Sequence, residues 1–314
     1  MSGLTAFFLA MALFAVGLAL LTVFPILGFF FLSLLAAALL EKLCWILLVP
    51  YVLWWFLVHG RKNAERWTDL RQYRYAHRGF HDKPAIPENS LPAFARAVEH
   101  GFGAELDVHL TEDGRLAVLH DSALKRVCGA EGDVEDRTAA ELDAFRLEGT
   151  DNRIPFLEEV LPLFEGKTPL VVEIKPAGGN YAVLTEKTVA CLDRFSVKYC
   201  VESFDPRVLL WLRTHRPDII RGQLAQNFLR DAGGLNLFHR IMLTNLFYNV
   251  RTRPDFIAYK FEDRKNLSRS LCCRLWGVQA FYWTLRSPAD LARAERESAL
   301  AIFETFDPTK EAAS

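Results

Sequence analysis

Residues 104–110 read AELDVHL, a short run in which acidic and apolar side chains alternate. Side chains along a β-strand point to opposite faces in turn, so Glu105 and Asp107 share one face. Residues 169–175, PLVVEIK, end in the same way, with Glu173 and Lys175 on one face. Both segments predict β-strands that carry charged groups close to their ends.

Similar short apolar runs alternate with helical stretches from residue 74 onward, which predicts parallel strands joined by crossover helices. Eight strands in about 250 residues favour the α/β class and, within it, a closed TIM (β/α)8 barrel. An open doubly wound sheet is the alternative, but no glycine-rich phosphate-binding fingerprint follows the first strand. The predicted strands are Arg74–Arg78, Ala104–Leu110, Pro169–Lys175, Tyr199–Phe204, Ile219–Leu224, Phe256–Lys260, Val278–Trp283 and Leu300–Phe303.

Helices are predicted between most of these strands. The segment Leu91–His100 has an apolar face with 3.6-residue spacing, and Gly101 follows it as a C-terminal stop. The polar, glycine-containing residues 121–155 are expected to leave the barrel as an excursion between its second and third units. The other predicted helices are Phe156–Phe164, Tyr181–Phe195, Pro206–His215, Leu235–Tyr248 and Pro288–Glu297.

The first 60 residues differ sharply from the remainder of the 314-residue chain. Only two charged residues, Glu41 and Lys42, separate apolar runs at residues 4–40 and 43–58. Together these runs exceed the roughly 20 residues that one helix needs to cross a bilayer. They are also too long for a signal peptide and lack its basic start. The sequence thus predicts a transmembrane anchor and argues against a fully soluble protein.

The anchor is expected to contain two helices. Pro25 and Gly28 should interrupt the first apolar run, because proline removes a helical hydrogen bond. Three helices are the alternative if Ile26–Leu40 crosses separately. Residues 61–73 are expected to form a basic juxtamembrane linker and residues 74–314 the barrel. No apolar run of spanning length follows residue 60, which excludes a multispanning transporter.

The flanking charge predicts the orientation of this anchor. Basic residues next to a membrane span favour the cytoplasmic side, so we expect an integral protein of the cell membrane whose barrel faces the cytoplasm. Six cysteines without CxxC spacing fit a reducing compartment. A net charge of −1 gives no indication of nucleic-acid binding. The basic flanking residues are Arg61, Lys62, Arg66, Arg71 and Arg74.

Active sites of TIM barrels lie at the C-terminal ends of the strands. Three carboxylates at that end, Glu105, Asp107 and Glu173, would repel one another unless a cation lay between them. Oxygen ligands suit Mg²⁺ or Ca²⁺, whereas zinc prefers histidine and cysteine. Any one of these acids alone would be read as a solvated strand end. All three at strand ends favour one divalent cation.

Two histidines at strand or hairpin ends, His77 and His120, are the candidate proton carriers. One would take a proton from the attacking oxygen and the other would protonate the leaving oxygen. Arg78 offers a planar fork suited to phosphate oxygens. Lys175 would add a point charge or merely neutralise Glu173.

These residues fall into motifs that resemble the glycerophosphodiester phosphodiesterase family over roughly residues 74–310. The sequence departs from the family's pattern near the end of the chain. There, residues 304–308, ETFDP, stand in the place of the family's common Thr-Asp-x-Pro segment. The matching motifs are AHRG at 76–79, PENS at 87–90, ELDV at 105–108, TEDG at 111–114, HD at 120–121, EIK at 173–175, SF at 203–204 and WT at 283–284.

The resemblance implies roles for individual residues. Glu105, Asp107 and Glu173 would hold the cation, and His77 and His120 would be the acid and base. Glu88 would be a further site residue that reaches towards the metal. The residues implied to bind substrate are Arg78, Lys175, Ser203 and Trp283.

The implied reaction is hydrolysis of a glycerophosphodiester to an alcohol and glycerol phosphate at a lipid bilayer. A lysophospholipase D-like activity on lysophospholipids is the alternative within enzymes. A catalytically silent lipid-binding protein is one alternative outside enzymes, and the complete set of two histidines and three carboxylates argues against it. A membrane-tethered structural module, in which the acids are only surface charge, is the other alternative.

Overall fold

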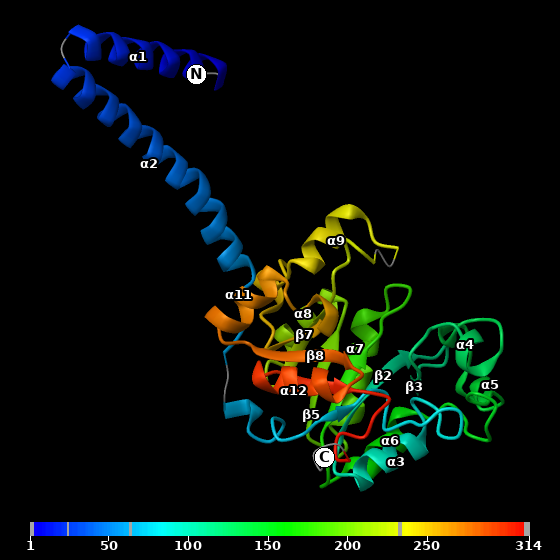
Figure 1. The fold of residues 1–314 in the computed structure, drawn as a ribbon. Coiled ribbons are helices and arrows are strands. Elements are labelled where there is room, and N and C mark those ends of the chain that lie inside the picture. Colours follow the sequence, from blue (N-terminus) through cyan, green and yellow to red (C-terminus); the bar gives the residue numbers. More distant parts are fainter. Residues whose placement is uncertain (1–2, 24, 63–64, 232–233, 311–314) are drawn as a thin grey trace. The chain divides into compact units, whose positions relative to one another are not determined.

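The computed structural model describes residues 3–23, 25–62, 65–231 and 234–310 and divides into two compact units, Met1–Phe56 and Leu57–Ser314. The first unit consists of helices α1, Gly3–Val23, and α2, Pro25–Leu57 (Figure 1).

The helices of the first unit modify the predicted anchor. α2 begins at Pro25, as expected for a residue that suits a first helical turn, but it continues through Gly28 and through the charged pair at residues 41–42. Among the described residues, Phe29–Leu57 is long and apolar enough to cross a bilayer, and a second apolar stretch, Leu4–Ala19, is shorter. The predicted number of crossings stays a prediction.

The second unit is built on a closed parallel barrel, which confirms the predicted fold. β1 pairs in parallel with both β2 and β9, so the first and last strands close the sheet. β3, Leu116–Val118, pairs antiparallel with β2 beside the barrel. The barrel strands are β1 Tyr75–Ala76, β2 Gly103–Leu110, β4 Leu170–Ile174, β5 Tyr199–Ser203, β6 Arg221–Ala225, β7 Phe256–Lys260, β8 Gln279–Leu285 and β9 Leu300–Phe303.

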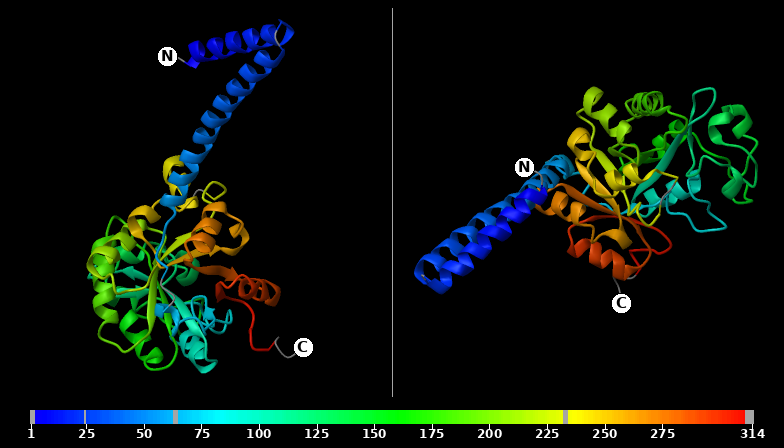
Figure 2. Two further views of the ribbon diagram at one scale, coloured as in Figure 1. Left: turned by 90° about the vertical axis from the view of Figure 1, so that its left-hand side faces the viewer. Right: turned by 90° about the horizontal axis from the view of Figure 1, so that it is seen from above.

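Helices surround these strands (Figures 1 and 2). The helix predicted at 235–248 is shorter than expected, because turns follow Thr244. α11 was not predicted, since its buried residues Ser268, Arg269 and Cys272 give no apolar periodicity. The outer helices are α3 Leu91–Glu99, α6 Leu157–Phe164, α7 Tyr181–Leu192, α8 Pro206–His215, α9 Leu237–Thr244, α10 Asn249–Thr252, α11 Leu267–Leu275 and α12 Pro288–Arg296.

Residues 65–75 close the N-terminal end of the barrel. The buried Trp67 ring lies 5.4 Å from the ring of Phe256, the first residue of β7, and 5.8 Å from that of Phe281. The Tyr75 hydroxyl donates a hydrogen bond to the Leu70 carbonyl at 2.9 Å. This plug fills the N-terminal end of the barrel with aromatic side chains.

The predicted excursion at 121–155 has a small core of its own. It contains the short helices α4, Lys125–Cys128, and α5, Ala139–Leu142. Leu119 immediately before it packs among its apolar side chains. Because it follows directly on His120, the excursion stabilises the segment that carries this histidine.

Part of the basic charge after the first unit belongs to the barrel. Arg61 pairs with the buried Asp255 at 2.7 Å, and Arg66 lies 3.6 Å from the same carboxylate. Arg74 pairs with Glu295 at 2.7 Å. These residues therefore stabilise the barrel, whatever they contribute to membrane orientation.

Candidate active site

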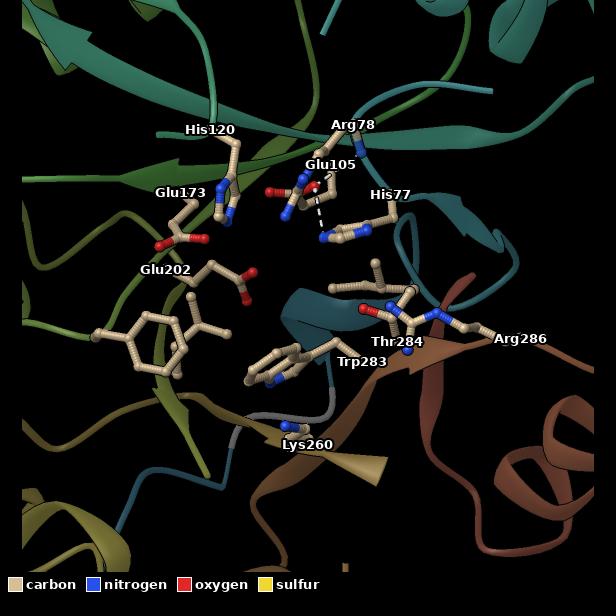
Figure 3. Close-up of a pocket in the computed structure, with 13 residues that line it drawn as sticks. His77, Arg78, Glu105, His120, Glu173, Glu202, Lys260, Trp283, Thr284 and Arg286 are labelled. Carbon is tan, nitrogen blue, oxygen red and sulfur yellow. Dashed lines mark hydrogen bonds and ion pairs between the residues drawn. The ribbon is translucent and has the colours of Figure 1, made fainter. Parts of the chain in front are cut away.

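A cavity of about 190 Å³ opens at the C-terminal ends of the strands (Figure 3). Its wall combines residues from β2 and from β4 to β9 with the segments that follow β1, β3, β5 and β8. The lining residues are His77, Arg78, Glu105, His120, Glu173, Glu202, Phe204, Leu224, Lys260, Trp283, Thr284, Arg286 and Ile302.

The three predicted carboxylates meet at this end of the barrel. One oxygen of each of Glu105, Asp107 and Glu173 lies within 4.8 Å of the others, and all three side chains are buried. Asp107 is in register with Glu173, which is itself in register with Glu202 on β5. The parallel pairing thus aligns Asp107, Glu173 and Glu202 in one row across three strands.

The negative charge of Glu105 and of this row of carboxylates fits a bound cation. Burial raises the pKa of Glu105 well above its usual range, and the negative charges of Asp107 and Glu173 add to this effect. Burial likewise raises the pKa of Glu173 to about 7, although the neighbouring Lys175 opposes the shift. Glu202 Oε2 is buried and accepts no hydrogen bond within the described part of the chain. Buried oxygen donors with excess negative charge are the ligands that Mg²⁺ and Ca²⁺ prefer.

His77 follows β1 and is oriented by Glu304, the residue that follows the last strand. Its Nδ1 lies 2.5 Å from Glu304 Oε2, and its Nε2 lies 3.9 Å from Glu105 Oε2. Burial lowers the pKa of His77, while the bond to Glu304 opposes that shift. The ring is thus fixed through Nδ1, which leaves Nε2 on the side of the carboxylate cluster.

His120 is oriented in the same way from another segment. Its Nδ1 lies 2.6 Å from Asp121 Oδ1. The backbone carbonyl of His120 lies 3.2 Å from Nε2 of His109, whose Nδ1 is 2.7 Å from Glu135 Oε1. Burial lowers the pKa of His120 to about 4, although the charge of Asp107 opposes the shift. The two cavity histidines therefore each have Nδ1 held by a carboxylate.

Arg78 lines the cavity and is held from behind by Glu88. Arg78 Nη1 donates to Glu88 Oε1 at 2.8 Å, and the Arg78 backbone N–H donates to Glu105 Oε2 at 2.9 Å. Glu88 also accepts from Arg126 at 2.6 Å and from Lys83 at 2.5 Å. Burial alone would raise the pKa of Glu88, but these cations hold it well below its usual range. Glu88 thus positions Arg78, and its oxygens are occupied by cations of the chain.

The turn between β1 and α3 depends on glycine. Gly79 has φ +79°, and a Cβ at this position would lie 2.9 Å from the backbone of Ala93 in α3. Only glycine fits such a close approach without displacing the helix. Gly79 therefore allows His77 and Arg78 to leave the strand towards the cavity.

The remaining predicted site residues take different positions. Lys175 Nζ lies 3.1 Å from Glu173 Oε1 and 3.2 Å from Asp107 Oδ1, behind the cavity wall. Trp283 lines the cavity, with its ring edge-on to Phe204 at 5.6 Å. The structure does not bring Ser203 to the cavity, because its hydroxyl donates to the Ile174 carbonyl at 2.7 Å and accepts from the Asp205 N–H.

Sequence reasoning missed several residues around the cavity. Glu202 had a recognisable signal, since it is a carboxylate near a strand end like Glu105 and Glu173. Glu304 lies in the segment that departs from the family pattern, and it bonds both His77 and Arg286. The missed residues are Glu202, Phe204, Lys260, Thr284, Arg286 and Glu304.

Comparisons with known proteins identify the family to which the chain is similar. Residues 77–236 match the glycerophosphoryl diester phosphodiesterase family. A glycerophosphodiester phosphodiesterase of Caldanaerobacter subterraneus subsp. tengcongensis is 33% identical over 244 residues, which cover 74% of this chain and 93% of the relative. Lysophospholipase D GDPD1 of Rattus norvegicus is 34% identical over 261 residues, covering 71% of this chain and 80% of that protein.

The fold is shared with solved structures. A phosphodiesterase of Oleispira antarctica in complex with the product sn-glycerol-3-phosphate superposes with a TM-score of 0.63 at 19% identity, covering 77% of this chain and 96% of that one. Together with the family match and the 33% identical relative, the barrel and its carboxylate cluster lead to one assignment. The chain belongs to the glycerophosphoryl diester phosphodiesterase family, a family of phosphoric diester hydrolases.

Proposed function

We propose that the chain hydrolyses glycerophosphodiesters to an alcohol and glycerol phosphate, with His77 and His120 as the acid and base. The observation that carries this proposal is that two carboxylate-oriented imidazoles line one cavity together with Glu105 and Glu173, two members of the buried carboxylate cluster that Asp107 completes. Such a site can move protons at the two oxygens exchanged in phosphodiester hydrolysis.

The proton transfers balance between the two histidines. Nε2 of one imidazole takes the proton of the attacking hydroxyl as its oxygen bonds to phosphorus. The other imidazole, protonated, gives its proton to the alcohol oxygen as the phosphorus–oxygen bond breaks. The attacking hydroxyl belongs either to water or to the neighbouring glycerol carbon, which would give a cyclic phosphate that water then opens. Both routes use the same pair of proton carriers.

The charged groups around the cavity supply the electrostatics. Arg78 would bind the phosphate oxygens through its guanidinium group, which Glu88 holds in place. Lys175 would offset part of the charge on Asp107 and Glu173. A divalent cation held by Glu105, Asp107 and Glu173 would polarise the phosphoryl oxygen and stabilise the developing negative charge.

A substrate panel tests the proposal. Purified full-length protein is incubated with glycerophosphocholine, glycerophosphoethanolamine and glycerophosphoglycerol, with Mg²⁺ or Ca²⁺, and the products are followed by phosphorus NMR. We expect glycerol phosphate to appear, EDTA to stop its formation and one of the two ions to restore it. Release that continues unchanged in EDTA would reject the metal, and the absence of any release would reject the reaction.

A lysophospholipase D-like activity is the second candidate, because the 34% identical relative carries that name and residues 29–57 include a candidate membrane span. The products distinguish the two functions. Lysophosphatidylcholine would yield choline and lysophosphatidic acid, whereas glycerophosphocholine yields choline and glycerol phosphate. Comparing the kcat/KM values for both substrates in one proteoliposome preparation decides which is preferred.

We further propose that the first unit anchors the protein in the cell membrane with the barrel in the cytoplasm. All six cysteines are free thiols, two of them the adjacent Cys272 and Cys273, which suits a reducing compartment. A C-terminal tag should therefore be inaccessible to antibody in intact cells and accessible after permeabilisation. Labelling of the tag in intact cells would overturn this orientation.

A further inference from the structure

The exposed apolar side chains of the barrel unit are concentrated in one part of the chain. Among its described residues, seven large apolar side chains are exposed, and all except Val183 lie between residues 229 and 275. We call five of these side chains the α9 patch: Leu229, Leu237, Phe238, Ile241 and Leu267.

Helix α9 supplies the centre of this patch. Its side chains Leu237 and Phe238 are 61% and 62% exposed, although both are apolar, while Leu243 on its other face is buried. The helix is fixed to the barrel at its C-terminal end, where the Tyr259 hydroxyl donates to the Thr244 carbonyl at 3.0 Å. The outward apolar face is thus held in place by the fold.

Helix α11 extends the patch. Asn266 donates to the Thr244 carbonyl at 3.2 Å, and Ser268 donates to Asn245 Oδ1 at 3.4 Å. These contacts place the start of α11 against the end of α9, as Figure 1 shows. Leu267 lies between the two bonded residues and is 62% exposed, so it continues the apolar surface.

The patch is connected to the cavity wall. Arg240 of α9 donates to the backbone carbonyls of Phe228 and Leu229, both at 2.6 Å. The Phe228 ring packs edge-on against Phe204 at 5.9 Å, and Phe204 lines the cavity. The buried Phe228 ring and the Arg240 hydrogen bonds therefore connect the cavity wall to α9.

The segment of the chain that carries the patch is basic, although Arg269 in it is buried and Lys260 lines the cavity. Residues 226–276 contain nine lysines and arginines against four acids, in a chain whose net charge is −1, and residues 234–254 contain no acid at all. An exposed apolar helix face in a basic segment suits the interface of an anionic bilayer. A soluble partner would have to combine apolar contacts with negative charge, which an anionic lipid surface presents by its nature.

We propose that the α9 patch docks on an anionic lipid bilayer and holds the cavity wall beside the lipid surface. The proposal rests on the membrane anchoring proposed above, because the anchor would keep the barrel close to a bilayer. It deepens the proposed function, since it gives the same site access to phosphodiesters embedded in lipid.

Photolabelling of the full chain tests the docking directly. The protein is reconstituted in vesicles that contain phosphatidylglycerol and a phospholipid with a diazirine in its acyl chain, irradiated, and mapped by peptide mass spectrometry. We expect labels on peptides covering residues 229–241 and 267, with labels on residues 3–57 as the internal positive control. Labels confined to residues 3–57 would overturn the proposal.

Lipid composition and substitutions sharpen the result. Labelling of the patch should fall by about fivefold or more in pure phosphatidylcholine vesicles, because basic residues are attracted to anionic lipids. The triple variant Leu237→Ser, Phe238→Ser, Ile241→Ser should lose the label. Val183→Ser, which changes an exposed apolar position on α7 outside the patch, is the matched control. Equal patch labelling in the triple variant and the parent would contradict the assignment.

Activity provides an independent readout. The triple variant should hydrolyse lysophosphatidylcholine in vesicles more slowly than the parent and water-soluble glycerophosphocholine at the same rate. A chain inactive on both substrates would reject the proposed function, while the labelling would still decide the docking. A dimer in nanodiscs that the triple variant abolishes, without lipid labelling of the patch, would assign the surface to a second copy and overturn the proposal.

Discussion

Glu304, which follows β9, lies 2.5 Å from His77 Nδ1 through Oε2 and 2.9 Å from Arg286 Nε through Oε1. Although burial would raise it, the bond to His77 lowers the pKa of Glu304 to about 2. An ionised carboxylate at this place accepts a hydrogen bond from Nδ1–H, so the proton of the neutral ring stays on Nδ1 and the lone pair lies on Nε2. Glu304, directly after the last strand, thus sets the tautomer of His77, directly after the first strand.

Replacing this carboxylate should impair His77 through its orientation. Glu304→Gln removes the charge, and the amide can also donate to Nδ1 and favour the wrong tautomer. We expect kcat to fall about 10²-fold with little change in KM, within the range that acid–base catalysis contributes. Glu295→Gln, which removes the carboxylate of an exposed ion pair with Arg74, is the matched control. Equal kcat values for Glu304→Gln and the parent would show that Glu304 does not position His77.

His120→Ala should nearly abolish turnover and leave the fold intact. The imidazole is partly exposed on the cavity wall and does not belong to the apolar core. We expect a loss of roughly 10²–10⁴-fold in kcat and a thermal unfolding transition close to that of the parent. His215→Ala removes an exposed imidazole on α8 and serves as the control. Comparable rates for His120→Ala and the parent would remove His120 from its proposed role.

Asp107→Asn should weaken cation binding. The change keeps the size of the side chain but removes one of three charges from the carboxylate cluster. Calorimetric titration with Mg²⁺ and Ca²⁺ should show an affinity at least about tenfold lower, since hard cations prefer charged oxygen ligands. Asp113→Asn changes an exposed carboxylate of the neighbouring hairpin and should titrate like the parent. An unchanged titration of Asp107→Asn would reject this ligand.

The buried Glu202 should make the metal-free protein sensitive to high pH. Burial and the charges of Glu173 and Asp107 raise the pKa of Glu202 well above its usual value. Its contribution to stability is fully present below the unfolded-state pKa of about 4.3 and is lost as pH rises through the folded-state value. In EDTA, Glu202→Gln should therefore raise the melting temperature more at pH 8 than at pH 5.

The size of this effect follows from linkage. Each unit of pKa shift corresponds to about 1.4 kcal/mol, and about 1 kcal/mol moves the melting temperature of a domain of this size by roughly 2–4 °C. Added Mg²⁺ or Ca²⁺ should reduce the difference between the two pH values, because a bound cation offsets the negative charge of Glu202. Glu186→Gln, an exposed change on α7, is the control. An equal rise in melting temperature for Glu202→Gln at pH 5 and pH 8 would show that the charge of Glu202 does not destabilise the metal-free protein.

The sequence by itself determined the barrel and the centre of its site. Alternation along single strands put Glu105 and Asp107 on one face, and the order of strands and helices put both at one end of a parallel barrel. These inferences succeeded because both depend on local backbone geometry. That geometry sets the direction of each side chain along a strand, and it makes parallel strands finish at the same end of the barrel.

Only the tertiary structure decided which other groups belong to the cavity. Glu304 lies 227 positions from His77 in the sequence, yet closure of the barrel brings them into contact. Conversely, Glu88 and Ser203 lie close to site residues in the sequence, but neighbouring hydrogen-bond donors and acceptors engage them away from the cavity. The reason is physical: a contact across a closed sheet depends on register and on competition among partners, which no local pattern records.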